Sequence, residues 1–125
     1  MTNIQSNSNS KNPKQNFDLE ERTIKFSENL IDFLKTLEQS AISKPLINQT
    51  LRSGTSIGAN YSEANECNSK KDFINKIAIA KKESKETKYW LRIIAHTFPE
   101  IKPKIRTLWQ EAQELKDKDL PAQLA

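Results

Sequence analysis

The stretch SIGANYSEANE, residues 56–66, has the pattern of the middle of a helix, although it contains Gly58 and follows Gly54. At about 100° per residue, both glycines fall on the face that a helix over residues 44–66 would bury. That face holds Ile47, Thr50, Gly54, Ile57, Gly58 and Tyr61. Each glycine costs about 1 kcal/mol relative to alanine in a helix interior. We therefore expect the two glycines to let a second helix backbone approach closely.

Three further segments carry a stripe of residues at alternating spacings of four and three, which is typical of amphipathic helices. The stripes are Leu19, Thr23, Phe26, Leu30, Phe33 and Leu37, then Phe73, Ile77, Ala80, Ser84, Thr87, Leu91 and Ile94, and finally Ile101, Ile105, Leu108, Ala112 and Leu115. Together with the glycine-containing segment, they predict helices over about 18–39, 44–66, 69–96 and 99–118. Because short connections favour antiparallel neighbours, the expected fold is all-α, an antiparallel up-down-up-down four-helix bundle.

Residues between the four apolar stripes predict where the helices begin. Ser43 is the expected N-cap of the second helix, because a hydroxyl there can accept a bond from a free backbone N–H. Ser69, followed three residues later by Asp72, resembles a capping box for the third helix. Either Pro99 or Pro103 is expected to open the fourth helix, where the missing N–H of proline costs nothing.

Length and composition limit the class of protein. The 125 residues are enough for one domain, here placed at 17–118. Residues 1–16 are mostly Asn, Ser, Gln and Lys, which predicts a disordered tail, and residues 119–125 are expected to fray. No apolar run approaches the roughly 20 residues that cross a bilayer, and the N-terminus lacks a secretory signal. With Cys67 as the single cysteine, these features predict a cytoplasmic protein.

Positive charge is concentrated in the second half of the chain. Residues 1–66 contain 7 Lys and Arg against 8 Asp and Glu, whereas residues 67–125 contain 13 against 8. Five cations recur along one edge of the third helix, namely Lys70, Lys81, Lys85, Lys88 and Arg92. Cations at helical spacing can follow a phosphate backbone, so this edge is the predicted nucleic-acid-binding surface. The alternative is a solvated face whose charge serves solubility only.

Two surfaces predict self-association. The outer face of the second helix contains Arg52, Ser56, Ala59, Asn60 and Glu63. Between the charged residues at its two ends, this face is small and uncharged. On the third helix, Ile79, Trp90 and Ile93 form an apolar stripe away from the core, and Ile24 and Ile31 form a similar pair on the first helix. Exposed apolar stripes usually mark interfaces. The alternative is a wider core that includes Trp90 at its rim.

The sequence lacks the residue combinations that are typical of catalytic or metal-binding sites. The only histidine, His96, falls near the end of the third helix, where a capping role is expected. Cys67 has no histidine near it in sequence and is expected to be a small buried side chain. Neither a Glu-x-x-His pair nor a phosphate-binding glycine loop is present. The sequence therefore predicts no enzyme activity, no metal site and no cofactor.

Two segments resemble a known family. RSGTSIGANYSEANECNSKKDF, residues 52–73, and KIAIAKKESKETKYWLRII, residues 76–94, are similar to the four-helix-bundle proteins encoded in 23S rRNA intervening sequences. That family includes the accessory variability determinant of diversity-generating retroelements. The resemblance covers about residues 17–117, and the chain departs from the usual pattern at Ser62 and Ala64. It implies a homopentameric ring and, for the retroelement branch, a basic assembly that binds RNA and a reverse transcriptase.

The leading hypothesis is therefore a non-enzymatic, homo-oligomeric bundle that binds RNA or an RNA–protein complex through the lysine edge of its third helix. RNA, further copies of the chain and a reverse transcriptase are the expected partners, and a membrane is not. A structural module that binds only protein is the competing hypothesis.

Overall fold

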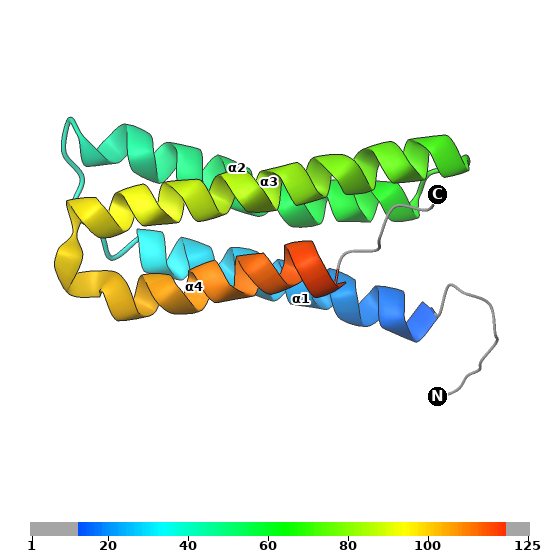
Figure 1. Cartoon of the computed structure of the whole chain (residues 1–125), viewed down its shortest axis with the longest axis horizontal. Helices are drawn as coiled ribbons and strands as arrows, with labels where there is room; N and C mark the ends of the chain where they lie inside the picture. Colours follow the sequence, from blue (N-terminus) through cyan, green and yellow to red (C-terminus); the bar gives the residue numbers. More distant parts are fainter. Residues whose placement is uncertain (1–12, 120–125) are drawn as a thin grey trace.

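The computed structural model describes residues 13–119, with side chains from 18 to 117 (Figure 1). Its four helices are α1 (Pro13–Leu34), α2 (Ser43–Asn65), α3 (Lys70–Thr97) and α4 (Lys102–Glu114). A 3₁₀ turn, η1 (Pro99–Ile101), precedes α4, and a π-helical turn, η2 (Leu115–Asp119), continues it. Between residues 13 and 119 there is no strand. The outermost residues of both expected tails, 1–12 and 120–125, lie outside the described residues.

The helices run alternately up and down along one long axis. Figure 1 shows the α1–α2 connection and the η1 turn at one end of the bundle, and the α2–α3 turn at the other. Helix α2 packs most extensively against α3, while α1 contacts α2 and α4. The predicted all-α, antiparallel four-helix arrangement is confirmed.

The core is built from the stripes that the sequence predicts. All six stripe residues of α1 and its following turn are buried, including Leu37 beyond the end of the helix. Leu30 of α1, Ile57 of α2, Leu91 of α3 and Leu115, where η2 continues α4, have no exposed surface. Burying a side chain of this size contributes roughly 1.5–3 kcal/mol, so the stripes supply the main driving force for folding.

Both glycines of α2 lie against α1, as expected. An ideal Cβ on Gly54 would lie 2.1 Å from Cδ2 of Leu30, and one on Gly58 would lie 2.9 Å from Cβ of Thr23. At Gly54 a methyl group would have to displace the end of the Leu30 side chain, whereas at Gly58 it would meet a Cβ that is fixed to the backbone of α1. The glycines therefore allow α1 to approach α2 more closely than an alanine would permit.

Polar contacts between helices were not predicted. Ser53 and Thr87, both buried, place their hydroxyl oxygens 2.9 Å apart across the α2–α3 interface. At the α1–α4 interface, Arg22 Nε lies 2.7 Å from Glu111 Oε2, and its Nη2 lies 2.9 Å from Glu114 Oε1. These contacts satisfy polar groups that are wholly or partly removed from water.

The first helix begins and ends earlier than predicted. It starts at Pro13 rather than near residue 18, so residues 13–16 belong to a helix and not to the expected tail. It ends at Leu34 rather than near residue 39. The N–H groups of Thr36 and Leu37 bond to carbonyls three residues back, at 3.0 and 3.2 Å, which tightens the chain into a turn. The apolar stripe continues to Leu37 because that turn still faces the core.

The cap of α2 differs from the prediction as well. Ser43 lies in the first turn, and it is the hydroxyl of Ser40 that accepts bonds from the N–H groups of Ile42 and Ser43, at 3.2 and 3.0 Å. Ser43 instead donates its hydroxyl to the carbonyl of Glu38 at 2.7 Å. For α3 the expected cap is present, because Ser69 Oγ accepts from the N–H of Asp72 at 3.1 Å.

Candidate nucleic-acid interface

The predicted cations of α3 divide into two groups. Lys81, Lys85, Lys88 and Arg92 follow one another at spacings of four, three and four residues, so they share one side of the helix. We call these four residues the basic edge. Lys85 and Arg92 are exposed, while Lys81 and Lys88 are half-buried. Lys70 is exposed in the first turn of α3, about 17 Å further along the axis at 1.5 Å per residue. The structure therefore separates it from the other four.

Lys88 is held against α4 and is not a free surface lysine. Its Nζ lies 4.8 Å from the ring centroid of Trp109 and donates to Oε1 of Gln113. Burial lowers the pKa of Lys88, and the neighbouring charges of Lys116 and Lys85 lower it further. Asp117 of η2 acts in the opposite direction and raises it. Lys88 therefore lies among charges of both signs from α3 and η2, with burial as the main cause of its lowered pKa.

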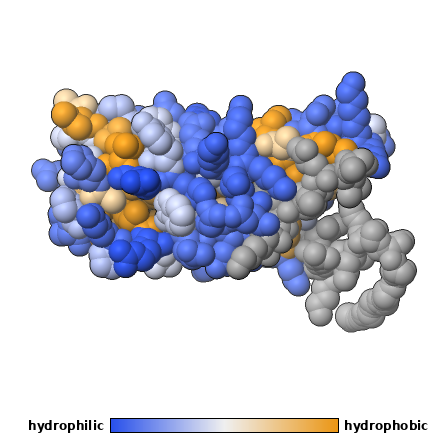
Figure 2. Space-filling view, viewed as in Figure 1, coloured by the Kyte–Doolittle hydropathy of each residue, from blue (hydrophilic) through white to orange (hydrophobic). Residues whose placement is uncertain are grey.

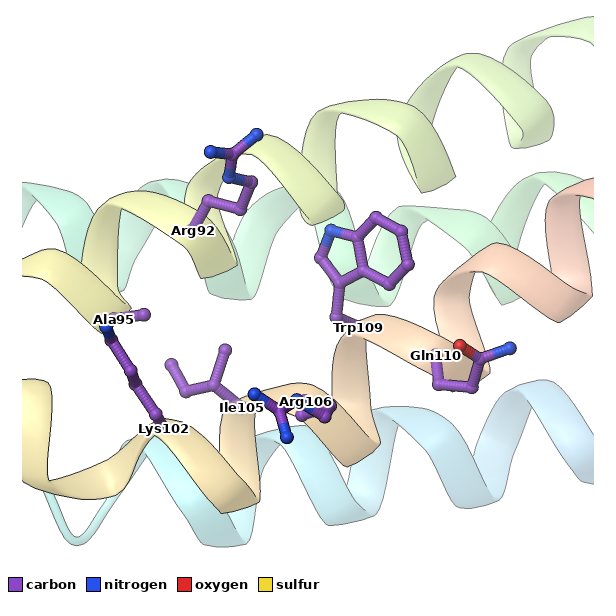
Figure 3. A pocket seen from close by; sticks show the side chains of 7 residues that line it. All are labelled: Arg92, Ala95, Lys102, Ile105, Arg106, Trp109 and Gln110. Atoms are coloured by element: carbon purple, nitrogen blue, oxygen red, sulfur yellow. The ribbon is translucent and has the colours of Figure 1, made fainter.

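A cavity opens between α3 and α4 beside the basic edge. It has a volume of about 560 Å³, and Figure 3 shows Arg92 above it, on α3, with Ile105, Arg106 and Trp109 on α4. Lys102 and Ala95 line its end nearest η1. Figure 2 shows hydrophobic residues gathered between α3 and α4 toward this end of the bundle, with strongly hydrophilic ones on either side. We call this feature the Trp109 cavity.

Lys102, Arg106 and Trp109 were not among the predicted site residues. A signal for them exists in the sequence, because their spacings of four and three residues place all three on one face of α4. The apolar stripe of this helix, which includes Ile105 and Leu108, predicts its core face and gives no role to the residues beside it. That face of α4 becomes part of a candidate site because Arg92 of α3 lines the other side of the same cavity.

The predicted association face of α2 and α3 contains charged residues that are paired within the chain. Arg52 lies 3.3 Å from Glu83 and contacts Glu86, and its pKa is raised, first by the hydrogen bond to Glu86. The indole N–H of Trp90 donates to Glu86 Oε2 at 3.0 Å. Further along, Lys76 Nζ lies 2.6 Å from Glu63 Oε1. These contacts link α2 to α3.

The uncharged members of that face are mostly half-buried. Ser56, Asn60, Ile79, Trp90 and Ile93 are all intermediate in exposure, and Ala59 is exposed. Trp90 is not part of the core cluster. Beside it, Tyr89 is 57% exposed, and the two rings meet edge to face with centroids 5.0 Å apart. An aromatic pair is thus available at the surface of α3.

A second apolar surface lies between α1 and α2. Ile24 and Ile31 are 44% and 37% exposed, which agrees with their predicted position off the core. They flank a groove of about 280 Å³, whose α2 side is formed by Thr55, Gly58 and Ala59, among others. We call this the isoleucine groove. Its small α2 residues follow from the same close approach of α1 and α2 that requires the glycines.

The residues considered for catalysis or metal binding do not come together in the described part of the chain. Among the described residues, no three His, Cys, Asp or Glu side chains come together as metal ligands. His96 lies exposed in the last turn of α3. Cys67 is half-buried rather than buried, and its Sγ lies 3.3 Å from the carbonyl oxygen of Glu63. None of the helices between residues 13 and 119 combines the length and apolar character of a membrane span.

Comparison with known proteins identifies a family and solved structures with the same fold. The model of the 23S rRNA-intervening sequence protein family matches residues 15–118. A crystal structure at 1.70 Å resolution, of a protein with unknown function from the S23 ribosomal protein family of Bacteroides thetaiotaomicron, has 32% sequence identity and a TM-score of 0.68. The alignment covers 78% of this chain and 91% of that one. No curated protein matches the chain.

Proposed function

Because the chain belongs to the family of 23S rRNA-intervening sequence proteins, we propose that it binds RNA without cleaving it, on the side where α3 and α4 meet. The family description connects such proteins with 23S rRNA, which supports an RNA-related role. The observation that carries the proposal is the convergence of cations from two helices. Arg92, at one end of the basic edge of α3, lines the same cavity as Lys102 and Arg106 of α4.

Phosphate contact accounts for the binding in physical terms. Each cation that neutralises a phosphate releases condensed counterions, so affinity falls as salt rises. For four phosphates on a single strand, the slope of log affinity against log salt is about −3. Such contacts position the nucleic acid without reading its bases. The basic edge therefore binds RNA by charge and shape.

Charge reversal on the basic edge tests this proposal. In the variant Lys81→Glu, Lys85→Glu, Arg92→Glu, we expect a loss of RNA affinity of more than about tenfold and a shallower salt dependence. Lys88 is left unchanged because it packs over Trp109. The matched control, Lys25→Glu, Lys35→Glu, Lys44→Glu, changes the same number of charges at exposed positions elsewhere. Equal losses in both variants, or no RNA binding by the wild-type protein at any salt concentration, would overturn the proposal.

Self-association belongs to the same proposal. The isoleucine groove and the Tyr89–Trp90 pair expose apolar surface that a second copy can cover. Several copies would repeat the basic edge and strengthen binding to one RNA molecule. The family resemblance predicts a pentamer and, for the retroelement branch, a reverse transcriptase as partner. Light scattering of the purified protein tests the first prediction.

The alternative is a module that binds only protein. Exposed Ile24, Ile31 and Tyr89 favour it, because apolar surface attracts proteins as readily as further copies of this chain. The salt experiment separates the two functions. A protein that assembles but shows no salt-dependent RNA binding would support the alternative.

A further inference from the structure

Among the described residues, no carboxylate forms an ion pair with the cations of the Trp109 cavity. Of the described residues that line the cavity, none is acidic. The ion pairs of the described part of the chain involve Arg22, Arg52, Lys76 and Lys116, and none involves Arg92, Lys102 or Arg106. Three cations thus line one cavity beside an apolar surface. Such an arrangement favours a bound anion.

The wall of the cavity supplies a different interaction. Trp109 is half-buried and packs against the core, so its ring is held in place. Figure 3 shows the indole standing between α3 and α4, with its ring nitrogen on the side of Arg92. Ile105 and Ala95 add apolar surface. An aromatic wall with an apolar floor is the surface on which a nucleobase stacks, and about 560 Å³ is within the range of small-ligand sites.

Lys88 determines which part of the ring is available. Its ammonium group lies over Trp109 but does not line the cavity. Lys88 therefore occupies one face of the ring, and a base that enters the cavity can use only the part of the indole that lines it. The Trp109 cavity therefore offers a stacking surface for a single base.

We infer that the Trp109 cavity accepts an unpaired base of an RNA strand, with the flanking phosphates bound by Arg92, Lys102 and Arg106. The inference rests on the proposed RNA binding and deepens it, because it names the class of RNA. A paired base is stacked inside the duplex and cannot reach Trp109, whereas an unpaired base can be splayed out onto an aromatic ring. The chain therefore prefers single-stranded segments or loops to a continuous duplex.

Two measurements on wild type and Trp109→Leu test the inference. Affinity for a short oligouridylate and for a blunt duplex of equal length is measured by fluorescence anisotropy at one salt concentration. Tryptophan emission is then followed during the oligouridylate titration. We expect wild type to prefer the single strand and to lose emission on binding. Trp109→Leu retains only Trp90 and should lose both the quenching and about tenfold in single-strand affinity, with unchanged duplex affinity.

A second pair of variants tests the phosphate contacts and does not depend on replacing a packed side chain. Arg106→Gln removes a cation that lines the cavity, whereas Lys104→Gln removes an exposed cation of the same helix that does not. Only the first should weaken single-strand binding. Circular dichroism verifies the fold of each variant, and where Trp109→Leu fails to fold, the glutamine pair decides.

The outcomes distinguish the two proposals. If single strand and duplex bind equally well, and Arg106→Gln behaves like Lys104→Gln, the inference is wrong while the proposed RNA binding stands. If neither nucleic acid binds to wild type, the proposed function fails and the inference with it.

Discussion

Thr23 on α1 occupies the space into which a side chain at Gly58 on α2 would extend. An ideal Cβ at Gly58 would lie 2.7 Å from Thr23 Oγ1 and 2.9 Å from Thr23 Cβ. Because Thr23 Cβ is attached directly to the backbone of α1, it cannot move away without moving the helix. The separation of α1 and α2 is therefore set at this contact.

Gly58→Ala should lower the free energy of unfolding by about 1–3 kcal/mol, because the added methyl group overpacks this contact. Helix propensity alone predicts the opposite sign, a gain of about 1 kcal/mol. The exposed neighbour provides the control, since Ala59→Gly should cost only the propensity difference of about 1 kcal/mol. Urea unfolding monitored by circular dichroism measures both. A stabilised Gly58→Ala protein would show that the helices are not in close contact here.

The hydroxyls of Ser53 and Thr87 should be energetically coupled. They lie 2.9 Å apart and are buried, so removing one leaves the other with a poorer partner. Thr87→Val preserves shape and should cost about 1–2 kcal/mol, because Thr87 Oγ1 also bonds to the carbonyl of Glu83. In a double-mutant cycle with Ser53→Ala, the combined loss should be smaller than the sum of the single losses. Strictly additive losses would contradict the hydrogen bond.

Glu86 should contribute an acid-sensitive part of the stability. Its pKa is lowered from the ordinary value of 4.5, first by the indole N–H of Trp90 and then by Arg52. A carboxylate with a lowered folded pKa stabilises the fold fully above its unfolded pKa, and the contribution is lost as the pH falls through the folded value. Between about pH 6 and about pH 3, the urea midpoint of wild type should therefore fall further than that of Glu86→Gln.

The control for this titration is Glu38→Gln, which removes an exposed carboxylate from the α1–α2 connection. It should keep the full acid dependence of wild type. If Glu86→Gln and wild type lose stability in parallel as the pH falls, then Glu86 does not carry this contribution.

Charge in the isoleucine groove should prevent self-association. The variant Ile24→Glu, Ile31→Glu places two carboxylates on a surface that a second copy would bury, which is costly for unpaired charges. Light scattering should then give the mass of one chain, 14.4 kDa. Ile42→Glu is the control, because Ile42 is 70% exposed in the α1–α2 connection and does not line the groove. A wild-type protein that is itself a single chain at high concentration would refute this form of assembly.

The sequence by itself determined the helices and the core. Spacings of three and four residues predicted the stripes that contain Leu30, Ile57 and Leu91, because a helix repeats every 3.6 residues and burial follows that period. The role of Gly54 and Gly58 followed in the same way, since both point to the buried face. The end of α1 was predicted less well. Leu37 continues the apolar stripe, while the bonds that close the turn at Thr36 and Leu37 depend on the path of the following connection.

Only the tertiary structure decided which polar residues meet. Ser53 meets Thr87 only because α3 packs against α2. Arg52 lies on the predicted outer face, but the same packing brings Glu83 and Glu86 to it. The Trp109 cavity is the clearest case, because Arg92 and Trp109 come from different helices. Periodicity within one helix gives the direction in which a side chain points. Which residues that side chain contacts depends on the rotation and axial position of a second helix. The packing of the whole bundle sets both.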